Sequence, residues 1–439
     1  MKLNSNVITG ALIVSLGGFL FGFDTAVISG AEKQIQELFS LSPFWHGVTI
    51  SSALIGTVTG ALFSGRPADR YGRKPLLFII AGLYVLTAVG SGVAPNVALF
   101  IFFRFIGGIG VGASSVVAPM YIAETSPAQH RGRMTSMFQF NVILGITVAY
   151  ISNFLLRDFG EEPWRWMLGI AAIPALLYLL LLFRIPESPR FLIKTGNVQQ
   201  AKKVMLKLGE QDIDDKLEEI EGSIKSSQVN EGLLSGRYNK PLIIAFLVAM
   251  FNQFSGINAI LYYAPRIFEL SGLSNAESLF QSIIVGITMG ISTIAGMILI
   301  DRTGRKKLLI TGSLGMSLSL ALVAMSFYQG GHSGLMLLGY LIAYILFFGF
   351  STGAVIWVLI AEIFPNNVRG KGQSFGSFTH WFFAALITFA FPLFAKGSGT
   401  GVGHTFLFFA LMMIVQAFVT WRYFPETKGK TLEQINEAR

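Results

Sequence analysis

The sequence of 439 residues contains no cysteine, which excludes disulfide bonds, thiol chemistry and cysteine-ligated metal sites. It also carries little charge. Asp, Glu, Lys and Arg make up 13% of the residues, against roughly 25% in soluble domains. No Walker A string is present, so we expect no nucleotide site. From these absences we expect neither an enzyme nor a bound cofactor or metal ion.

What the chain has in abundance is long apolar runs. Hydrophobic residues make up 52% of it, and the mean hydropathy is +0.60. A helix of about 20 apolar residues crosses a bilayer. Lipid offers no hydrogen-bond partner to backbone N–H and C=O groups, so these groups must be paired within the protein. The runs therefore predict an all-α membrane protein with twelve transmembrane helices. They cover residues 6–30, 47–66, 75–94, 97–122, 133–156, 166–185, 240–268, 278–300, 307–328, 335–361, 372–395 and 403–424. The first run contains Asp24 and is too long for a signal peptide core, so we take it as a helix that spans the membrane.

Three charged strings occur twice, in the same order. D-R-x-G-R-K is found at 69–74 and 301–306, an E-x6-R-G string begins at Glu124 and again at Glu362, and P-E-S/T is found at 186–188 and 425–427. The two copies of each string are separated by nearly the same distance along the chain. This pattern indicates an internal duplication of a large half.

One segment between the halves is polar. Within it, Val198–Leu208 and Ile213–Ile224 have amphipathic helical spacing. We therefore predict an N-terminal six-helix half at 1–186, a helical cytoplasmic linker at 187–238, a C-terminal six-helix half at 239–425 and a cytoplasmic tail at 426–439. Two duplicated six-helix halves are typical of secondary transporters, in which the substrate binds near the midplane between the halves.

The net charge of +9 indicates membrane topology, and we do not take it as a sign of nucleic-acid binding. Most Lys and Arg of the short loops lie on one side, near residues 66–74, 131–133, 302–307 and 369–371. The positive-inside rule places that side, with both termini, in the cytoplasm of a cell-membrane protein.

Seven strings together carry a family resemblance. They are the doubled D-R-x-G-R-K, GFLFGFDTAVISG (18–30), RFIGGIGVG (104–112), PMYIAE (119–124), PESPRFL (186–192), NQFSGINAILYYAP (252–265) and PETKGKTLEQI (425–435). With them the chain resembles the sugar porter family of the major facilitator superfamily over essentially its whole length. The resemblance implies the major facilitator fold and a sugar as substrate, without specifying the sugar.

Ionisable residues inside transmembrane helices are costly and are by default candidates for function. Asp24 lies in the first run and Arg104 in the fourth. Burial favours a neutral Asp and a nearby Arg favours a charged one, so a pair that forms and breaks is a natural proton switch. The resemblance implies that Asp24 is the proton acceptor and Arg104 its partner. The alternatives are a static ion pair between helices, or an Asp24 without a role in a wet vestibule.

Polar and aromatic residues near the middle of the runs are candidates for substrate contacts. Amides both donate and accept hydrogen bonds, as sugar hydroxyls require, and aromatic faces suit the C–H faces of a sugar ring. The resemblance implies sugar contacts at Gln139, Asn252, Gln253, Asn258, Trp357 and Trp381, and we add Phe21 and His380 as candidates. The alternative is that Gln and Asn only join helices to one another.

The chain departs from the family pattern at several of these positions. Asn252 stands where Gln is usual, Met289 where Asn is common, and Ala354 where Pro often follows Gly. His380 stands where an amide is usual, and it could be a sugar contact, a packed histidine or a second proton site. These changes leave the identity of the sugar open.

Two further sets of residues are candidates for conformational roles. Tyr262 and Tyr263 follow Gly256, which should loosen the seventh helix. The resemblance implies that the two tyrosines are gate residues, and core packing is the alternative. Gly349 and Gly353 should make the tenth helix flexible. A larger set of charged residues could pair across the two halves. The resemblance implies that such ion pairs hold the cytoplasmic side closed. The alternative, which is compatible with this role, is that these charges set the membrane topology. The set comprises Asp69, Arg73, Glu124, Arg131, Asp301, Arg305, Glu362 and Arg369.

Taken together, the residues and the resemblance predict a secondary active transporter. It would import a monosaccharide, either hexose or pentose, with protons by alternating access, acting as a monomer in the bilayer. A passive sugar facilitator is the main alternative. A polyol transporter is a less favoured alternative. An organic acid would require more cations inside the runs than Arg104, and a sugar sensor would be expected to have a longer tail than the one after the last run.

Overall fold

The computed structural model describes residues 4–428 except 128, 211, 227–232, 234, 235, 237, 331–333, 366, 367 and 396–398, and these described residues form helices and no strand. In chain order the elements are α1 (Ser5–Leu38), α2 (Pro43–Phe63), α3 (Gly65–Tyr71), α4 (Arg73–Val93), α5 (Val97–Thr125), α6 (Arg131–Leu156), α7 (Pro163–Gly169), α8 (Ala172–Leu181), η1 (Leu182–Arg184), α9 (Pro189–Lys194), α10 (Val198–Leu208), α11 (Ile213–Ser226), α12 (Asn239–Phe254), α13 (Ile257–Glu269), α14 (Asn275–Thr303), α15 (Arg305–Tyr328), α16 (Gly334–Phe350), α17 (Thr352–Glu362), α18 (Arg369–Phe394) and α19 (Gly399–Tyr423).

Twelve of the described helical segments are long and apolar enough to cross a membrane. Three of them are composite: α7, α8 and η1 form one, α12 and α13 form another, and α16 and α17 form a third. Large apolar side chains such as Leu155, Phe183 and Leu335 are mostly exposed, which suits helices whose outer faces contact lipid. The predicted all-α fold with twelve transmembrane helices is confirmed.

The chain divides into two compact units, which do not coincide with the two repeats. The first unit comprises Met1–Thr25, Ile55–Ala149 and Arg165–Asn230, and the second comprises Ala26–Leu54, Tyr150–Trp164 and Glu231–Arg439. The second unit thus contains the ends of α1 and α6 and the start of α2 together with α12–α19.

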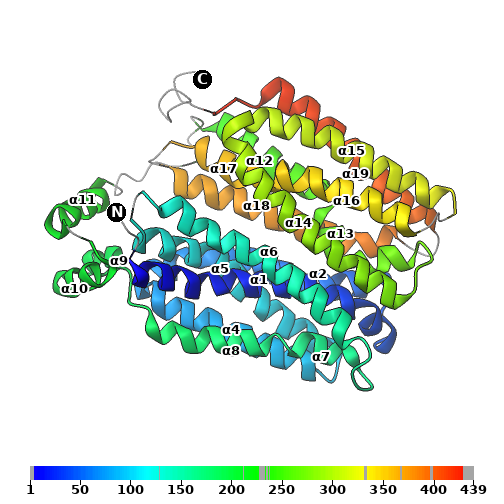
Figure 1. The fold of residues 1–439 in the computed structure, drawn as a ribbon, viewed down its shortest axis with the longest axis horizontal. Coiled ribbons are helices and arrows are strands. Elements are labelled where there is room, and N and C mark those ends of the chain that lie inside the picture. The colour runs from blue at the N-terminus through cyan, green and yellow to red at the C-terminus, as the bar shows by residue number, and fades with distance from the viewer. Residues whose placement is uncertain are drawn as a thin grey trace. The chain divides into compact units, whose positions relative to one another are not determined.

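In the first unit, α4 packs against α5 and α8, and the short helices α9, α10 and α11 lie near the start of α1 (Figure 1). The predicted amphipathic helices of the linker form as α10 and α11. Their apolar faces are buried against one another, against Leu192 of α9 and against Val7 of α1. The linker helices are therefore docked on the membrane-spanning part of this unit.

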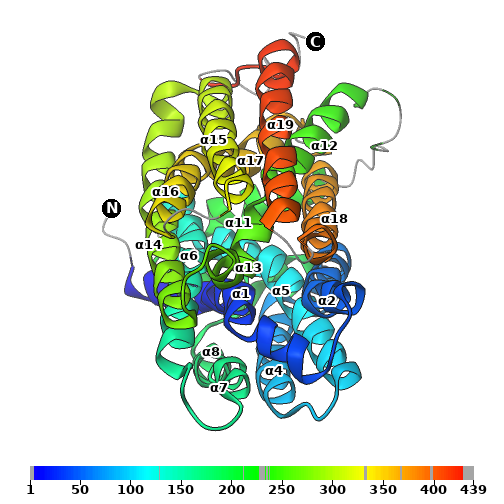
Figure 2. The same cartoon turned by 90° about the vertical axis from the view of Figure 1, so that its right-hand side faces the viewer.

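In the second unit, α15 packs along α19 and α16, α14 packs against α16, and α12 packs against α18 (Figures 1 and 2). Two of its spans are broken. Gly256 has φ +86° between α12 and α13, and a Cβ there would overlap the ring of Phe409, so glycine is required. Ser351, with φ −113° and ψ −98°, separates α16 from α17 between Gly349 and Gly353. Broken spans leave backbone groups without helical partners, as in the discontinuous helices that line transporter sites.

Candidate transport site

Asp24 of α1 is paired with Arg104 of α5 inside the first unit. The Nη1 of Arg104 donates to Oδ1 of Asp24, and its Nη2 lies 3.4 Å from the Asp24 carbonyl oxygen. The Arg104 side chain is 2% exposed and that of Asp24 is 13% exposed, so the pair is shielded from bulk solvent on most sides. A buried ion pair of this kind is stable only while both partners are charged.

The backbone of α1 is held close to α6 near this pair. A Cβ at Gly22 would overlap the backbone of Val142, and a Cβ at Gly145 would overlap the backbone of Phe19. Small residues at such contacts let transmembrane helices approach closely. The glycines therefore allow α1 to lie close to α6 just before Asp24 in the sequence. Phe21 and Gln139 are half-buried on α1 and α6 of the same unit.

The second unit holds a connected set of amides and a histidine at the α12–α13 break. Gln253 Nε2 donates to Asn252 Oδ1 at 2.9 Å and lies 3.2 Å from the His380 ring nitrogens. The Nδ2 of Asn258 donates to Gln253 Oε1 at 2.5 Å. The Gln253 side chain thus uses both ends within the network. Because a sugar hydroxyl can replace any of these bonds with one of its own, the set is suited to exchange partners.

Aromatic rings surround the histidine of this set. The ring of Trp357 lies 4.9 Å from that of His380, and the ring of Trp381 lies 4.7 Å from it at 89°. Trp381 and His380 are buried, whereas Trp357 is half-buried. The structure therefore brings Asn252, Gln253, Asn258, His380 and the two tryptophans together, from α12, α13, α17 and α18.

Tyr262 and Tyr263 are both buried on α13. Tyr263 has non-helical φ −125° and ψ 19°, its hydroxyl donates to the Thr388 carbonyl at 3.0 Å, and its ring stacks on Phe391. Gly349 lies where a Cβ would overlap Ser292 of α14, so it permits close contact between α14 and α16. These positions are compatible with either a gate or core packing.

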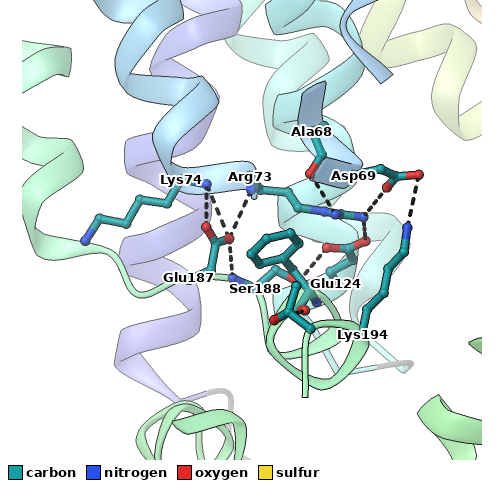
Figure 3. Close-up of polar contacts among 10 residues, drawn as sticks. Ala68, Asp69, Arg73, Lys74, Glu124, Glu187, Ser188 and Lys194 are labelled. Atoms are coloured by element: carbon teal, nitrogen blue, oxygen red, sulfur yellow. Dashed lines mark hydrogen bonds and ion pairs between the residues drawn. The ribbon is translucent and has the colours of Figure 1, made fainter. Parts of the chain in front are cut away.

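The first D-R-x-G-R-K string forms a turn between α3 and α4 that is closed by two carboxylates (Figure 3). The guanidinium of Arg73 donates to the Ala68 carbonyl at 3.0 Å and to Glu124 at 2.8 Å, and it lies 3.2 Å from Asp69. The Glu187 carboxylate accepts the backbone N–H groups of Arg73 and Lys74, each at 3.1 Å. Burial raises the pKa of Glu187, and the N–H donors of Ser188, Lys74 and Arg73 oppose that rise.

The second string repeats this arrangement in the second unit. Arg305 donates to the Ile300 carbonyl at 3.2 Å and to Glu362 at 2.8 Å. The Glu426 carboxylate accepts the N–H of Arg305 at 3.0 Å and that of Lys306 at 3.1 Å. Each copy is thus closed by residues of its own repeat.

Two members of the predicted charge network, Arg131 and Arg369, contribute less to this picture. Arg131 is exposed at the start of α6, and Arg369 begins α18 with its Nε 3.5 Å from the Phe364 carbonyl. Asp301 lies in α14, and its side chain is outside the described part. Pairing across the two halves stays a prediction. Among the described residues, no group of three or more His, Cys, Asp or Glu could hold a metal ion.

A protein-family model described as "Sugar (and other) transporter" matches residues 10–438. The chain belongs to this family, the sugar porters of the major facilitator superfamily. Sugar porters are transporters and not enzymes.

Relatives are similar to this sugar porter over nearly their whole length. It is 36% identical to the arabinose-proton symporter of Bacillus subtilis over 98% of this chain and 94% of the relative. It is 34% identical to the D-xylose-proton symporter of Escherichia coli over 98% and 95%, and 36% identical to a glucose transport protein of Synechocystis over 96% and 95%.

Solved structures of the xylose transporter from E. coli have the same fold. An inward-open conformation aligns with a TM-score of 0.88 at 34% identity, covering 98% of this chain and 99% of that one. A structure bound to 6-bromo-6-deoxy-D-glucose aligns with a TM-score of 0.82. The resemblance predicted from the sequence strings is confirmed.

Sequence reasoning missed the structural role of two carboxylates in this sugar porter. It noted P-E-S/T at 186–188 and 425–427 only as a sign of duplication. In the structure, Glu187 and Glu426 cap the backbone of the charged turns. The signal was available, because both strings recur with the same spacing as the turns that they close.

Proposed function

We propose that this sugar porter imports a monosaccharide together with protons by alternating access. The observation that carries the proposal is the buried Asp24–Arg104 pair in a chain whose relatives are named as arabinose- and xylose-proton symporters. A titratable carboxylate paired to a fixed cation inside a membrane helix is the element that a proton-coupled carrier needs and a passive facilitator does not.

In this proposal Asp24 accepts the proton and Arg104 is its partner. Protonation removes the charge of Asp24 and weakens the pair, which frees α1 from α5 and lets the halves change conformation. Each proton that crosses supplies about 2.3 kcal/mol per 100 mV of membrane potential. That free energy drives the sugar against its gradient.

The sugar is recognised by amides and aromatic rings. Gln253, Asn252 and Asn258 supply donors and acceptors beside the α12–α13 break, and Trp357 and Trp381 supply apolar faces. Phe21, Gln139 and His380 complete the proposed set. Because His380 lies within hydrogen-bond distance of Gln253, the amide at the centre of this set, we assign it to sugar contact and not to proton coupling.

The remaining candidates act on the conformational cycle. Tyr262 and Tyr263 gate the sugar path, and Gly349 and Gly353 allow α16 and α17 to bend at Ser351. The charged turns latch one side of the carrier in one of its states. The protein acts as a monomer in the cell membrane, with the charged turns and both termini in the cytoplasm, in accord with the excess of Lys and Arg there.

The test is sugar-driven proton uptake by the purified protein in liposomes. Wild type should acidify the lumen when arabinose, xylose or glucose is added outside, and an imposed proton gradient should concentrate the sugar. Asp24→Asn should abolish concentrative uptake while retaining exchange of sugar down its gradient. A passive facilitator would show no proton movement in wild type and no loss of concentration in the variant.

A further inference from the structure

A second buried carboxylate lies where α1, α2 and α13 meet in the second unit. Glu32 of α1 is 1% exposed. Its Oε2 lies 2.8 Å from Nε2 of His46 on α2, and it accepts a hydrogen bond from Nη1 of Arg266 on α13 at 3.1 Å. No part of the proposed transport chemistry uses these three residues.

The contact between α1 and α13 extends beyond this group. The same Nη1 of Arg266 donates to Gln36 Oε1 at 2.6 Å, and Lys33 Nζ donates to Glu269 Oε2 at 2.6 Å. On α1 the order of charge is negative then positive, and on α13 it is positive then negative. Two ion pairs of opposite polarity, Glu32–Arg266 and Lys33–Glu269, therefore join the same two helices.

Burial makes the Glu32 contacts consequential. An isolated buried carboxylate is strongly unfavourable, and removal of one partner of a buried charge pair leaves the other uncompensated. Glu32 is thus tolerated only while Arg266 stays beside it. His46 is also buried, and neither of its ring nitrogens makes a hydrogen bond of regular geometry among the described residues; its Nε2 lies 2.8 Å from Oε2 of Glu32, which is an ion-pair distance. By contrast, Lys33 is half exposed, and its pair with Glu269 contributes little.

The group is also in contact with the irregular part of α13. The His46 ring packs at 83° against the ring of Tyr263, with centroids 6.0 Å apart. Tyr263 is the residue with non-helical backbone in α13 and is itself anchored to Thr388 and Phe391 of α18. Movement of α13 away from α1 must therefore separate Arg266 from Glu32 and Tyr263 from His46 together.

We propose that Glu32, His46 and Arg266 form a polar lock that holds α13 against the ends of α1 and α2, and that this lock must open for sugar to enter from that end. The inference rests on the proposed function and assigns positioning residues to it. The lock residues do not touch the sugar. They set the fraction of carriers that are open to it.

This role has a kinetic signature. The apparent dissociation constant of a ligand equals the intrinsic value divided by the fraction of protein that is competent to bind. Weakening the lock raises that fraction and lowers the sugar KM from this end. It also lowers kcat, because reclosure is part of the cycle. Loss of folded protein would lower the measured rate without lowering KM.

The absence of cysteine permits a direct measurement of opening. Ser29 is 3% exposed and precedes Glu32 and Gln36 by one and two helical turns, so all three share a face of α1. We place the reporter Ser29→Cys in the full-length protein in detergent and follow its reaction with a charged maleimide, without sugar or a proton gradient. Added Glu32→Gln should speed labelling by about tenfold or more, a shift of ~1.4 kcal/mol.

Matched variants separate the lock from general effects. Glu37→Gln removes the same charge from an exposed position on α1 and should leave the labelling rate unchanged. Arg266→Gln should speed labelling as Glu32→Gln does, and the double variant should be no faster than either alone. Equal labelling in Glu32→Gln, Arg266→Gln and Glu37→Gln, or additive effects in the double variant, would overturn the proposal. Since the assay needs neither sugar nor coupling, a failure of proton symport would not change its outcome.

Discussion

Replacement of Gly72 by Ala should destabilise the protein by about 2.5–6 kcal/mol. Gly72 joins α3 to α4 with φ 100° and ψ 165°, a conformation that costs other residues about 1–3 kcal/mol. A Cβ there would also overlap the Glu187 carboxylate, which accepts the N–H groups of Arg73 and Lys74. Loss of one hydrogen bond to a charged group costs about 1.5–3 kcal/mol, and its sum with the backbone strain gives the expected range.

The chain offers controls that separate the two contributions. Gly196 has φ +81° with no atom within 4 Å of a Cβ, so Gly196→Ala reports the cost of a positive φ without any steric overlap. Gly304 has φ +91°, and a Cβ there would lie 2.6 Å from the Glu426 carboxylate, so Gly304→Ala should match Gly72→Ala. The free energy of unfolding is measured by denaturant titration in mixed micelles. If Gly72→Ala and Gly196→Ala lost the same free energy, the carboxylate would not be the element that holds the turn.

Three further substitutions test the site and the charged turns. Gln253→Ala should weaken sugar binding by about tenfold, because it removes the amide side chain that joins Asn258 to His380. Sugar binding is measured as the increase in thermal stability with sugar concentration. An unchanged midpoint of that titration would show that Gln253 is not part of the site. Arg73→Lys should cost about 1–3 kcal/mol of stability, because an ammonium cannot replace the guanidinium bonds to both Ala68 and Glu124. Arg305→Lys should lower the free energy of unfolding by a similar amount. An unchanged free energy of unfolding in both variants would contradict the role of the two guanidinium groups.

Features governed by local composition were predictable from the sequence. The twelve apolar runs, the linker helices α10 and α11 and the break at Gly256 all occur where hydropathy, helical period or a glycine placed them. These features depend on lipid thickness and backbone geometry, which are determined by a short stretch of sequence and do not require contacts with distant residues.

Features that depend on a distant partner were not predictable in the same way. Hydropathy predicts that the first span ends at residue 30, yet α1 continues to Leu38. The extension is polar, and hydropathy cannot distinguish a polar loop from a helix whose charges are matched elsewhere. Glu32 is buried only because His46 and Arg266 are brought to it by α2 and α13. Only a contact map could have revealed that match.

The two repeats are alike where they set structure and unlike where they are proposed to do chemistry. Their charged turns agree nearly bond for bond, from Arg73 and Glu187 to Arg305 and Glu426. In the interior, G-F-D ends at Asp24 and G-I-N ends at Asn258, at a spacing like that of the turns. The first copy thus has a carboxylate that can lose its charge, and the second has an amide that cannot. A duplicated scaffold with one titratable copy can place the proton site in one repeat and most of the proposed hydroxyl recognition in the other, with Gln139 of the first repeat completing the sugar set.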